Sequence, residues 1–177
     1  MTDHSDAASV EAVSPGRYRL DPNRSQVRYS SKHMFGMGTV QAVFTVQEGE
    51  LHLGEPMTTS SATVTIAAAS FASDNAKRDK DVRSAGLLDV DTYPHITFAS
   101  ERLQETPDGW LVTGDLTAHG QSVPVDVRID RLTDEGNGIR VRGHVEHLDR
   151  TAFGITGSRG MVGRYFNLEL DVFATAT

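Results

Sequence analysis

The chain has 177 residues, no cysteine and a formal net charge of −7, from 17 basic and 24 acidic side chains. This length is typical of one domain with a core of its own. The lack of cysteine excludes disulfide bonds, thiol catalysis and cysteine-bound zinc. The acidic balance argues against nucleic acid or an anionic membrane surface as a partner, because both require basic patches.

Residues 1–16 are small, acidic and aperiodic, so we expect a disordered N-terminal tail. Asp3, Asp6 and Glu11 stand where a secretory signal would need an apolar stretch. No run in the chain approaches the ~18 apolar residues of a membrane-spanning helix. The sequence therefore predicts a cytoplasmic protein with no integral membrane segment, whose folded domain covers residues 17–177.

From residue 17 onward, apolar and polar side chains alternate, as they do in strands with one buried face. Residues 123–130 illustrate the pattern, with valine or isoleucine at every odd position. About eight strands are predicted, from segments near residues 18–20, 27–31, 39–47, 62–66, 96–98, 110–116, 123–130, 139–146 and 166–172.

Short runs of turn-forming residues separate many of these segments. They lie at 48–49, 107–109, 119–120 and 134–138 and contain glycine together with proline, aspartate, glutamate, asparagine or histidine. Spacers of this length favour antiparallel hairpins over parallel crossovers.

One segment lacks the two-residue period. It reads DNAKRDKDVRS from residue 74 and is rich in helix-forming residues. We predict a short helix near 75–85, with Asp74 as its N-terminal cap. Lys77 with Asp81, and Asp79 with Arg83, have the i, i+4 spacing of helical ion pairs.

These elements predict an all-β fold, either a closed antiparallel barrel or a sandwich, with one short helix. The predicted inward positions include the small residues Ala42, Ala62, Gly114 and Gly143. Small residues relieve crowding in a filled barrel, and they also leave room for a slender guest. Periodicity alone leaves both interpretations open.

Candidate catalytic and metal-binding motifs are weak. His144 and His147 have HxxH spacing, but in a strand residues i and i+3 point to opposite faces, so we do not expect them to chelate a metal. The sequence contains no G-x-S-x-G elbow, and the run at 157–160 is only superficially similar to one. Acidic side chains occupy the exposed alternating positions. We therefore predict no catalytic residue, no metal site and no enzymatic activity.

Two glycine-containing loops are candidates for a binding portal. Residues 34–38 read MFGMG and carry three large apolar side chains. Such a loop is typical of a portal and also of a hairpin that folds onto the core. Glycines at 154, 157, 160 and 163 indicate a flexible connector or a mobile flap over the mouth of a barrel.

Six groups of residues, in order between Tyr18 and Ala174, resemble the motifs of the YceI family of polyisoprenoid-binding, lipocalin-like proteins. They are DPNRS at 21–25 followed by Val27, Tyr29 and His33; Phe44 and Gly49; KRD at 77–79; YPHITFAS at 93–100; GDLTAHG at 114–120; and DR at 149–150 with FGI at 153–155. Leu87 and Leu88 replace an aromatic pair of the family and keep the expected mouth apolar.

The resemblance implies an extended antiparallel lipocalin-like β-barrel of about eight strands that encloses a long isoprenoid chain. It implies non-catalytic binding, sequestration or transport of a polyisoprenoid lipid of the quinone or polyprenyl type, with no cofactor required. We expect the lining to consist of Phe44, Val46, Val64, Ile66, Ile96, Phe98, Val112, Leu116, Val125, Val127, Val141, Phe166, Leu168 and Leu170. Phe35, Leu87, Leu88 and Phe153 are the candidates for the mouth.

Four polar residues match the family motifs: His33, Arg78, Asp79 and Arg150. They are expected to hold a lipid head group or to lock the helix and loops, and we favour the structural role for Asp79 and Arg150. Two other functions stay open: a filled barrel that acts as a stress-related interaction module, and an enzyme for an apolar substrate. The sequence also leaves a homodimer open.

Overall fold

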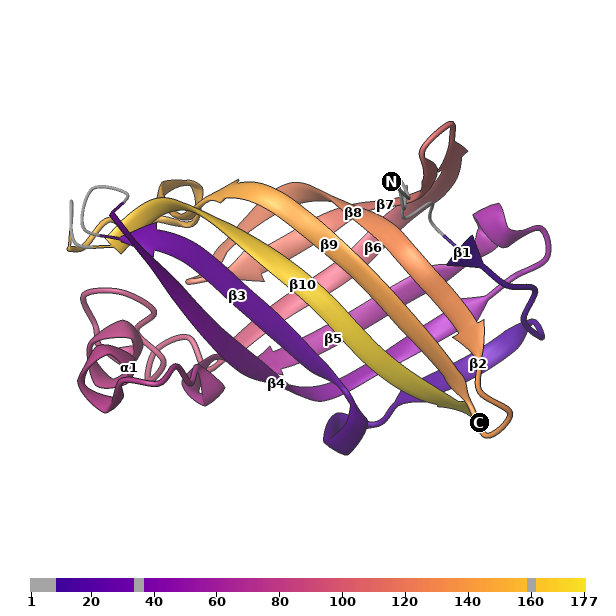
Figure 1. Ribbon diagram of the computed structural model, residues 1–177, viewed down its shortest axis with the longest axis horizontal. Helices are drawn as coiled ribbons and strands as arrows, with labels where there is room; N and C mark the ends of the chain where they lie inside the picture. Colours follow the sequence, from indigo (N-terminus) through magenta and orange to yellow (C-terminus); the bar gives the residue numbers. More distant parts are fainter. Residues whose placement is uncertain (1–8, 34–36, 159–161) are drawn as a thin grey trace, which may run out of the picture.

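The computed structural model describes residues 9–33, 37–158 and 162–177. Its main feature is a closed barrel of eight long antiparallel strands (Figure 1), which confirms the predicted fold. The strands are β3 (Gln26–His33), β4 (Gly38–Leu53), β5 (Ser61–Ala67), β6 (His95–Thr106), β7 (Gly109–Ala118), β8 (Gln121–Asp134), β9 (Ile139–Asp149) and β10 (Val162–Ala176).

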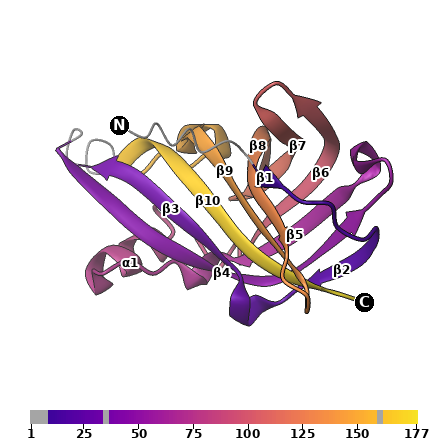
Figure 2. The same cartoon turned by 45° about the vertical axis from the view of Figure 1, so that its right-hand side comes forward.

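The barrel closes where the last strand returns to the first. Each strand from β3 to β10 pairs with its neighbour in sequence, and β10 also pairs with β3, with Leu168 opposite Tyr29 and Phe166 opposite Ser31. Closure removes the unpaired edges of an open sheet. The strands run obliquely across an elongated body, with α1 (Ala76–Arg83) at one end and the C-terminus at the other (Figures 1 and 2).

Alternation places one face of each strand inside the barrel. On β4, residues Val40, Ala42, Phe44 and Val46 are buried, and the residues between them are exposed. The predicted turn at 119–120 is also present: His119 and Gly120 both have positive φ angles, 52° and 74°, in a two-residue hairpin between β7 and β8.

Two short strands add to the barrel at the end opposite α1. β2 (Gly16–Leu20) lies between β4 and β10, and β1 (Ser9–Val10) pairs in parallel with Arg131–Leu132 of β8. The backbone N–H of Glu11 also donates to the carbonyl of Leu132 at 2.9 Å. The described part of the segment expected to be disordered is therefore partly ordered, because its backbone continues the ladder of β8.

The turn predicted at 48–49 is wrong. Strand β4 runs through these residues, and its pairing with β5 shifts register between Val46 and Glu48. A Cβ on Gly49 would collide with the side chain of Leu20 and with the carbonyl of Thr63. This glycine therefore permits close packing beside a β-bulge rather than a change of chain direction.

The helix forms where it was predicted, but its cap differs. The side chain of Asn75, not Asp74, accepts the backbone N–H of Arg78 at 3.0 Å. Asp74 instead forms an i, i+4 ion pair with Arg78 at 3.5 Å.

Asp79 and Arg83 do not form the predicted ion pair with each other. The buried carboxylate of Asp79 accepts hydrogen bonds from the backbone N–H and the hydroxyl of Ser73, the latter at 2.6 Å. The guanidinium of Arg83 donates to the carbonyl of Phe71. Both side chains thus fasten the helix to the segment that precedes it.

The DPNRS motif stabilises the barrel at the end opposite α1. It forms the 3-10 helix η1 (Pro22–Arg24), capped by Asp21. The hydroxyl of Ser25 accepts the backbone N–H of Phe173 at 3.0 Å, and the guanidinium of Arg24 lies 3.5 Å from the centre of the Phe173 ring. The motif therefore joins the start of β3 to the end of β10.

The remaining short helices are 3-10 turns: η2 (Met57–Thr59), η3 (Ala68–Ser70) and η4 (Arg150–Phe153). Within the described part of the chain, none of the helices combines the length and the apolar character needed to cross a membrane.

Candidate functional site

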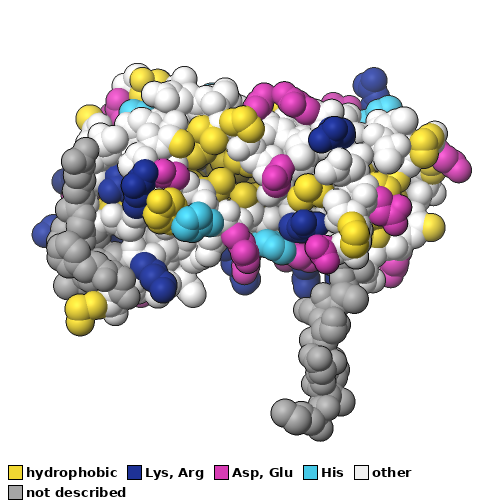
Figure 3. Space-filling model, turned by 90° about the horizontal axis from the view of Figure 1, so that it is seen from above, with side chains coloured by type: hydrophobic (Ala, Val, Ile, Leu, Met, Phe, Trp, Pro, Cys, Tyr) yellow, Lys and Arg dark blue, Asp and Glu magenta, His cyan; other side chains and the backbone are white. Residues whose placement is uncertain are grey.

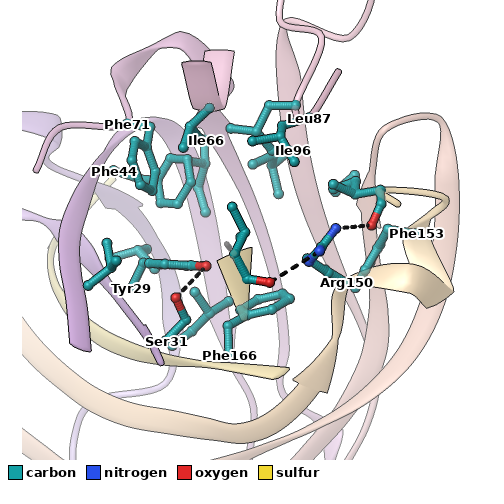
Figure 4. A pocket seen from close by; sticks show the side chains of 18 of the residues that line it. Tyr29, Ser31, Phe44, Ile66, Phe71, Leu87, Ile96, Arg150, Phe153 and Phe166 are labelled. Carbon is teal, nitrogen blue, oxygen red and sulfur yellow. Dashed lines mark hydrogen bonds between the residues drawn. The ribbon is translucent and has the colours of Figure 1, made fainter. Parts of the chain in front are cut away.

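The barrel contains an apolar cavity of about 150 Å³ near the end that carries α1 (Figure 4). Strands β3 to β7 and β10, the helices α1 and η4, and the loops beside them all contribute to its wall. The lining residues are Val27, Tyr29, Ser31, Val40, Phe44, Ile66, Phe71, Arg78, Val82, Leu87, Leu88, Ile96, Leu116, Ala118, Arg150, Phe153, Ile155, Val162, Phe166 and Leu168.

A cluster of aromatic rings forms much of this wall. Tyr29 and Phe166 stack with centroids 5.4 Å apart, and Phe71 makes edge contacts with Tyr29 and Phe44 at 5.5 and 5.4 Å. Phe153 lies 6.4 Å from Phe166. Such rings supply a large apolar area to the wall.

The helix and the loop after it cover one side of the cavity. Val82, Leu87 and Leu88 face it, and the N–H of Leu88 donates to the carbonyl of Val82 at 2.8 Å, which folds the loop back onto the helix. A side chain at Gly157 would collide with the carbonyl of Gly86. The connector between β9 and β10 therefore packs closely against this loop because residue 157 is glycine.

One polar pair lies inside the cavity. The hydroxyl of Tyr29 donates to Oγ of Ser31 at 2.9 Å (Figure 4). Burial raises the pKa of Tyr29 above its usual value, so the phenol stays neutral well into the alkaline range. The pair offers a guest a neutral hydroxyl group rather than a charge.

Arg150 is buried at the edge of the cavity, and backbone carbonyls surround its guanidinium. It donates to the carbonyls of Ile155 at 2.7 Å, Gly163 at 3.0 Å and Val162 at 3.2 Å. These contacts join Ile155, in the connector between β9 and β10, to the first residues of β10.

Arg78 and Asp79 are adjacent but face different surroundings. Arg78 lines the cavity, and its partner Asp74 has a side chain that is 95% exposed. Asp79 does not line the cavity and bonds to Ser73 instead. Among the described residues, Arg78 is a lining cation whose side chain is partly exposed, at 29%. Phe35 and the side chain of His33 lie outside the described residues.

The predicted lining divides into three groups. Nine of the predicted residues line the cavity: Phe44, Ile66, Leu87, Leu88, Ile96, Leu116, Phe153, Phe166 and Leu168. Val112 and Val141 line a second cavity at the opposite end. Val46, Val64, Phe98, Val125, Val127 and Leu170 line neither of these two cavities and pack with the core. The predicted lining is thus divided rather than continuous.

Several lining residues were not predicted. Tyr29, Val27 and Ser31 do alternate along β3, so their inward direction could have been read from the sequence. Phe71 and Ile155 lie in irregular segments. A two-residue period carries no information there, and only the tertiary structure brings them to the cavity.

The prediction for the HxxH histidines rested on the wrong geometry. The ladder between β9 and β10 shifts register near His147, whose φ is 57°. This bulge turns both His144 and His147 outward, whereas Val145 and Leu148 stay buried. His144 bonds to Asp130 at 2.7 Å. In the part of the chain that the structure describes, no cluster of three metal-ligating side chains is found.

Solved structures with the same fold cover most of the chain. The crystal structure of BcnA from Burkholderia cenocepacia matches with a TM-score of 0.75 and 23% identity, over 88% of this chain and 99% of that chain. A domain from Saccharophagus degradans, described as polyisoprenoid binding and implicated in plant cell wall breakdown, matches with a TM-score of 0.61 and 12% identity, over 93% of this chain and 100% of that chain.

Sequence comparisons agree with this likeness. A UPF0312 protein from Yersinia enterocolitica is 32% identical over 117 residues, which are 62% of this chain and 59% of that protein. The matched region therefore spans about three fifths of the length of this relative. The model of the YceI-like domain matches residues 18–174. The chain therefore belongs to the family of proteins with a YceI-like domain.

Proposed function

We propose that the protein binds a long-chain polyisoprenoid lipid, of the isoprenoid quinone or polyprenyl type, inside its barrel, and that it sequesters or carries this lipid without altering it chemically. The apolar cavity beneath α1 is the observation that carries the proposal. An isoprenoid chain is slender and apolar, so it needs depth and few polar contacts. Each buried methylene contributes about 0.8 kcal/mol.

The character of the lining supports an apolar guest. Apart from Arg78, Arg150, Tyr29 and Ser31, every lining side chain is aliphatic or aromatic. Of these four, Arg150 is engaged with backbone carbonyls, and Tyr29 donates to Ser31. The relative from Saccharophagus degradans is described as polyisoprenoid binding. The shared fold supports a similar guest here.

Arg78 is our candidate for the contact with the lipid head group. Its side chain lines the cavity and is also 29% exposed, so it can contact the polar end of a lipid whose chain lies inside. Its guanidinium carries donors for a phosphate or for a quinone carbonyl. Its partner Asp74 is exposed, so the pair can open at small cost in free energy.

The first test is native mass spectrometry with organic extraction of protein purified from its own host. We expect a stoichiometric isoprenoid, whose mass also identifies the head group. Phe44→Glu places a charge on the cavity wall and should abolish the uptake of added long-chain quinone. Thr45→Glu is the matched control, because the adjacent side chain is exposed on the outer face of β4. Equal uptake by both folded variants would contradict the proposed lining.

A filled barrel that acts through its surface is the second candidate function. The packed side chains between the two cavities favour it, because they occupy the middle of the barrel. This function predicts a protein that is empty after purification and takes up no added quinone. Figure 3 shows acidic, basic and histidine side chains interspersed on one face, a surface that such a module would present to a partner.

A further inference from the structure

A second apolar cavity, of about 90 Å³, lies at the end of the barrel away from α1. Its wall includes Leu53 at the end of β4, Ala62 at the start of β5 and Trp110 at the start of β7. Val10 of β1 also lines it. We call it the distal cavity, and the one beneath α1 the proximal cavity.

The two cavities lie in line along the same strands. On β6, Ile96 lines the proximal cavity and Ser100 the distal one, and Phe98 is the inward residue between them. On β5, Val64 stands in the same way between Ile66 and Ala62. Four residues of strand span about 13 Å, so on each of these two strands a single inward side chain separates the cavities.

This partition layer comprises Val46, Val64, Phe98, Gly114 and Val127. Val46 is fully buried, and Val127 is 5% exposed. Gly114 stands on β7 between Leu116 of the proximal cavity and Val112 of the distal one. The barrel interior is thus closed midway by side chains, although it is apolar on both sides.

Phe98 is the largest side chain of the layer, and it depends on Gly114 for its position. A Cβ on Gly114 would lie 2.8 Å from Cζ of Phe98, closer than a real contact allows. The ring therefore rests against the backbone of β7, in the space where residue 114 has no side chain. An aromatic ring has two side-chain torsions, so it can move without a change in the strands.

We propose that Phe98 sets the length of isoprenoid tail that the barrel accepts: short tails end at its ring, and longer tails must displace the ring to enter the distal cavity. This inference rests on the proposed function. It follows from the volumes, because a proximal cavity of about 150 Å³ is the size of an engineered cavity that binds benzene. A long tail needs the distal cavity as well.

Tryptophan fluorescence can report the entry of a tail into the distal cavity. Trp110 is the single tryptophan, and it lines the distal cavity. Prenols absorb little light where indole is excited, so a change in tryptophan emission reports a tail that has arrived beside the indole. Geraniol, the shortest, should bind without changing the emission of Trp110, and decaprenol should change it. Farnesol and geranylgeraniol then locate the tail length at which the change begins.

The decisive experiment measures the affinities of these four prenols, presented in mild detergent, for the full-length wild-type protein and for Phe98→Ala. We expect the variant to bind decaprenol at least about tenfold more tightly than wild type, because the cost of displacing the ring is removed, and to bind geraniol about equally. Phe44→Ala removes the same ring from the proximal wall. It is the matched control and should give no gain that is specific to long tails.

Two more variants keep the test decisive. Phe98→Leu is the milder replacement if Phe98→Ala unfolds, and it should give a smaller gain of the same sign. Ala62→Phe fills the distal cavity, and in the Phe98→Ala background it should cancel the gain for decaprenol. If affinity changes with prenol length in the same way for wild type and both Phe98 variants, the proposed role of Phe98 is overturned. A failure of every variant to bind any prenol would instead overturn the proposed function.

Discussion

Replacing Arg150 with methionine tests whether one buried cation holds the loop that borders the proximal cavity. Arg150 is 6% exposed, and its guanidinium donates to the carbonyls of Ile155, Val162 and Gly163. Methionine retains most of the aliphatic stem and removes all three donors. The change therefore isolates the hydrogen bonds from the packing of the side chain.

The expected loss of stability in Arg150→Met is large. A hydrogen bond to a charged group contributes about 1.5–3 kcal/mol, but the carbonyls that lose Arg150 regain part of this where water reaches them. For three such bonds together we therefore expect the free energy of unfolding to fall by about 3–5 kcal/mol. This is a large fraction of the ~5–15 kcal/mol that stabilises a typical domain.

Urea denaturation measures the loss, and native-state hydrogen exchange locates it. Amides of the β9–β10 connector should exchange much faster in Arg150→Met, and a bound isoprenoid should dissociate faster because the connector borders the cavity. Arg17→Met is the control, because this arginine is exposed and pairs with Glu50 on the surface, away from the connector. If Arg150→Met were within about 1 kcal/mol of wild type, with unchanged exchange in the connector, the structural role of Arg150 would be refuted.

Two further predictions concern ionisation. Hydrogen bonds from Arg164 and Thr151 lower the pKa of Asp149 to about 2, so its stabilising contribution is present above its usual pKa of 3.8 and is lost as the pH falls through about 2. Asp149→Asn should therefore lower the melting temperature at neutral pH. In circular dichroism melts, the difference in melting temperature between wild type and the variant should shrink as the pH falls, and a difference that stays constant down to pH 2 would contradict the prediction. Burial raises the pKa of Tyr29 above 10.0, so the neutral phenol stabilises the fold below pH 10 and this contribution is lost as the pH rises further. In ultraviolet titrations of wild type and Tyr29→Phe, the difference between the two curves should appear above pH 10, and the prediction fails if it appears at a lower pH.

Much of the barrel could be predicted from local patterns. Alternation identified the inward faces of β4 and β8, because successive side chains of a strand point to opposite sides. The hairpin at 119–120 was predictable because positive φ angles suit a tight turn that contains glycine. A helix near 75–85 was predicted because residues 74–84 lack a two-residue period, and α1 lies within the predicted range.

Long-range packing decided the rest. Gly49 was expected in a turn, but it lies inside β4 because Leu20 packs against it. Phe71 reaches the proximal cavity from an irregular segment, where no periodicity reveals its direction. His147 faces outward because of a bulge, which a two-residue period does not anticipate.

The sequence by itself determined the family, the closed antiparallel barrel and most of the side chains that face its interior, because all three depend on local patterns or on motifs read in order. Only the tertiary structure decided that this interior is divided, since the division depends on Phe98 meeting a residue without a side chain on the next strand. It likewise showed that Arg150 donates to backbone carbonyls and that Arg78 lines the proximal cavity. A motif specifies which residue is present, but its role depends on what the fold places beside it.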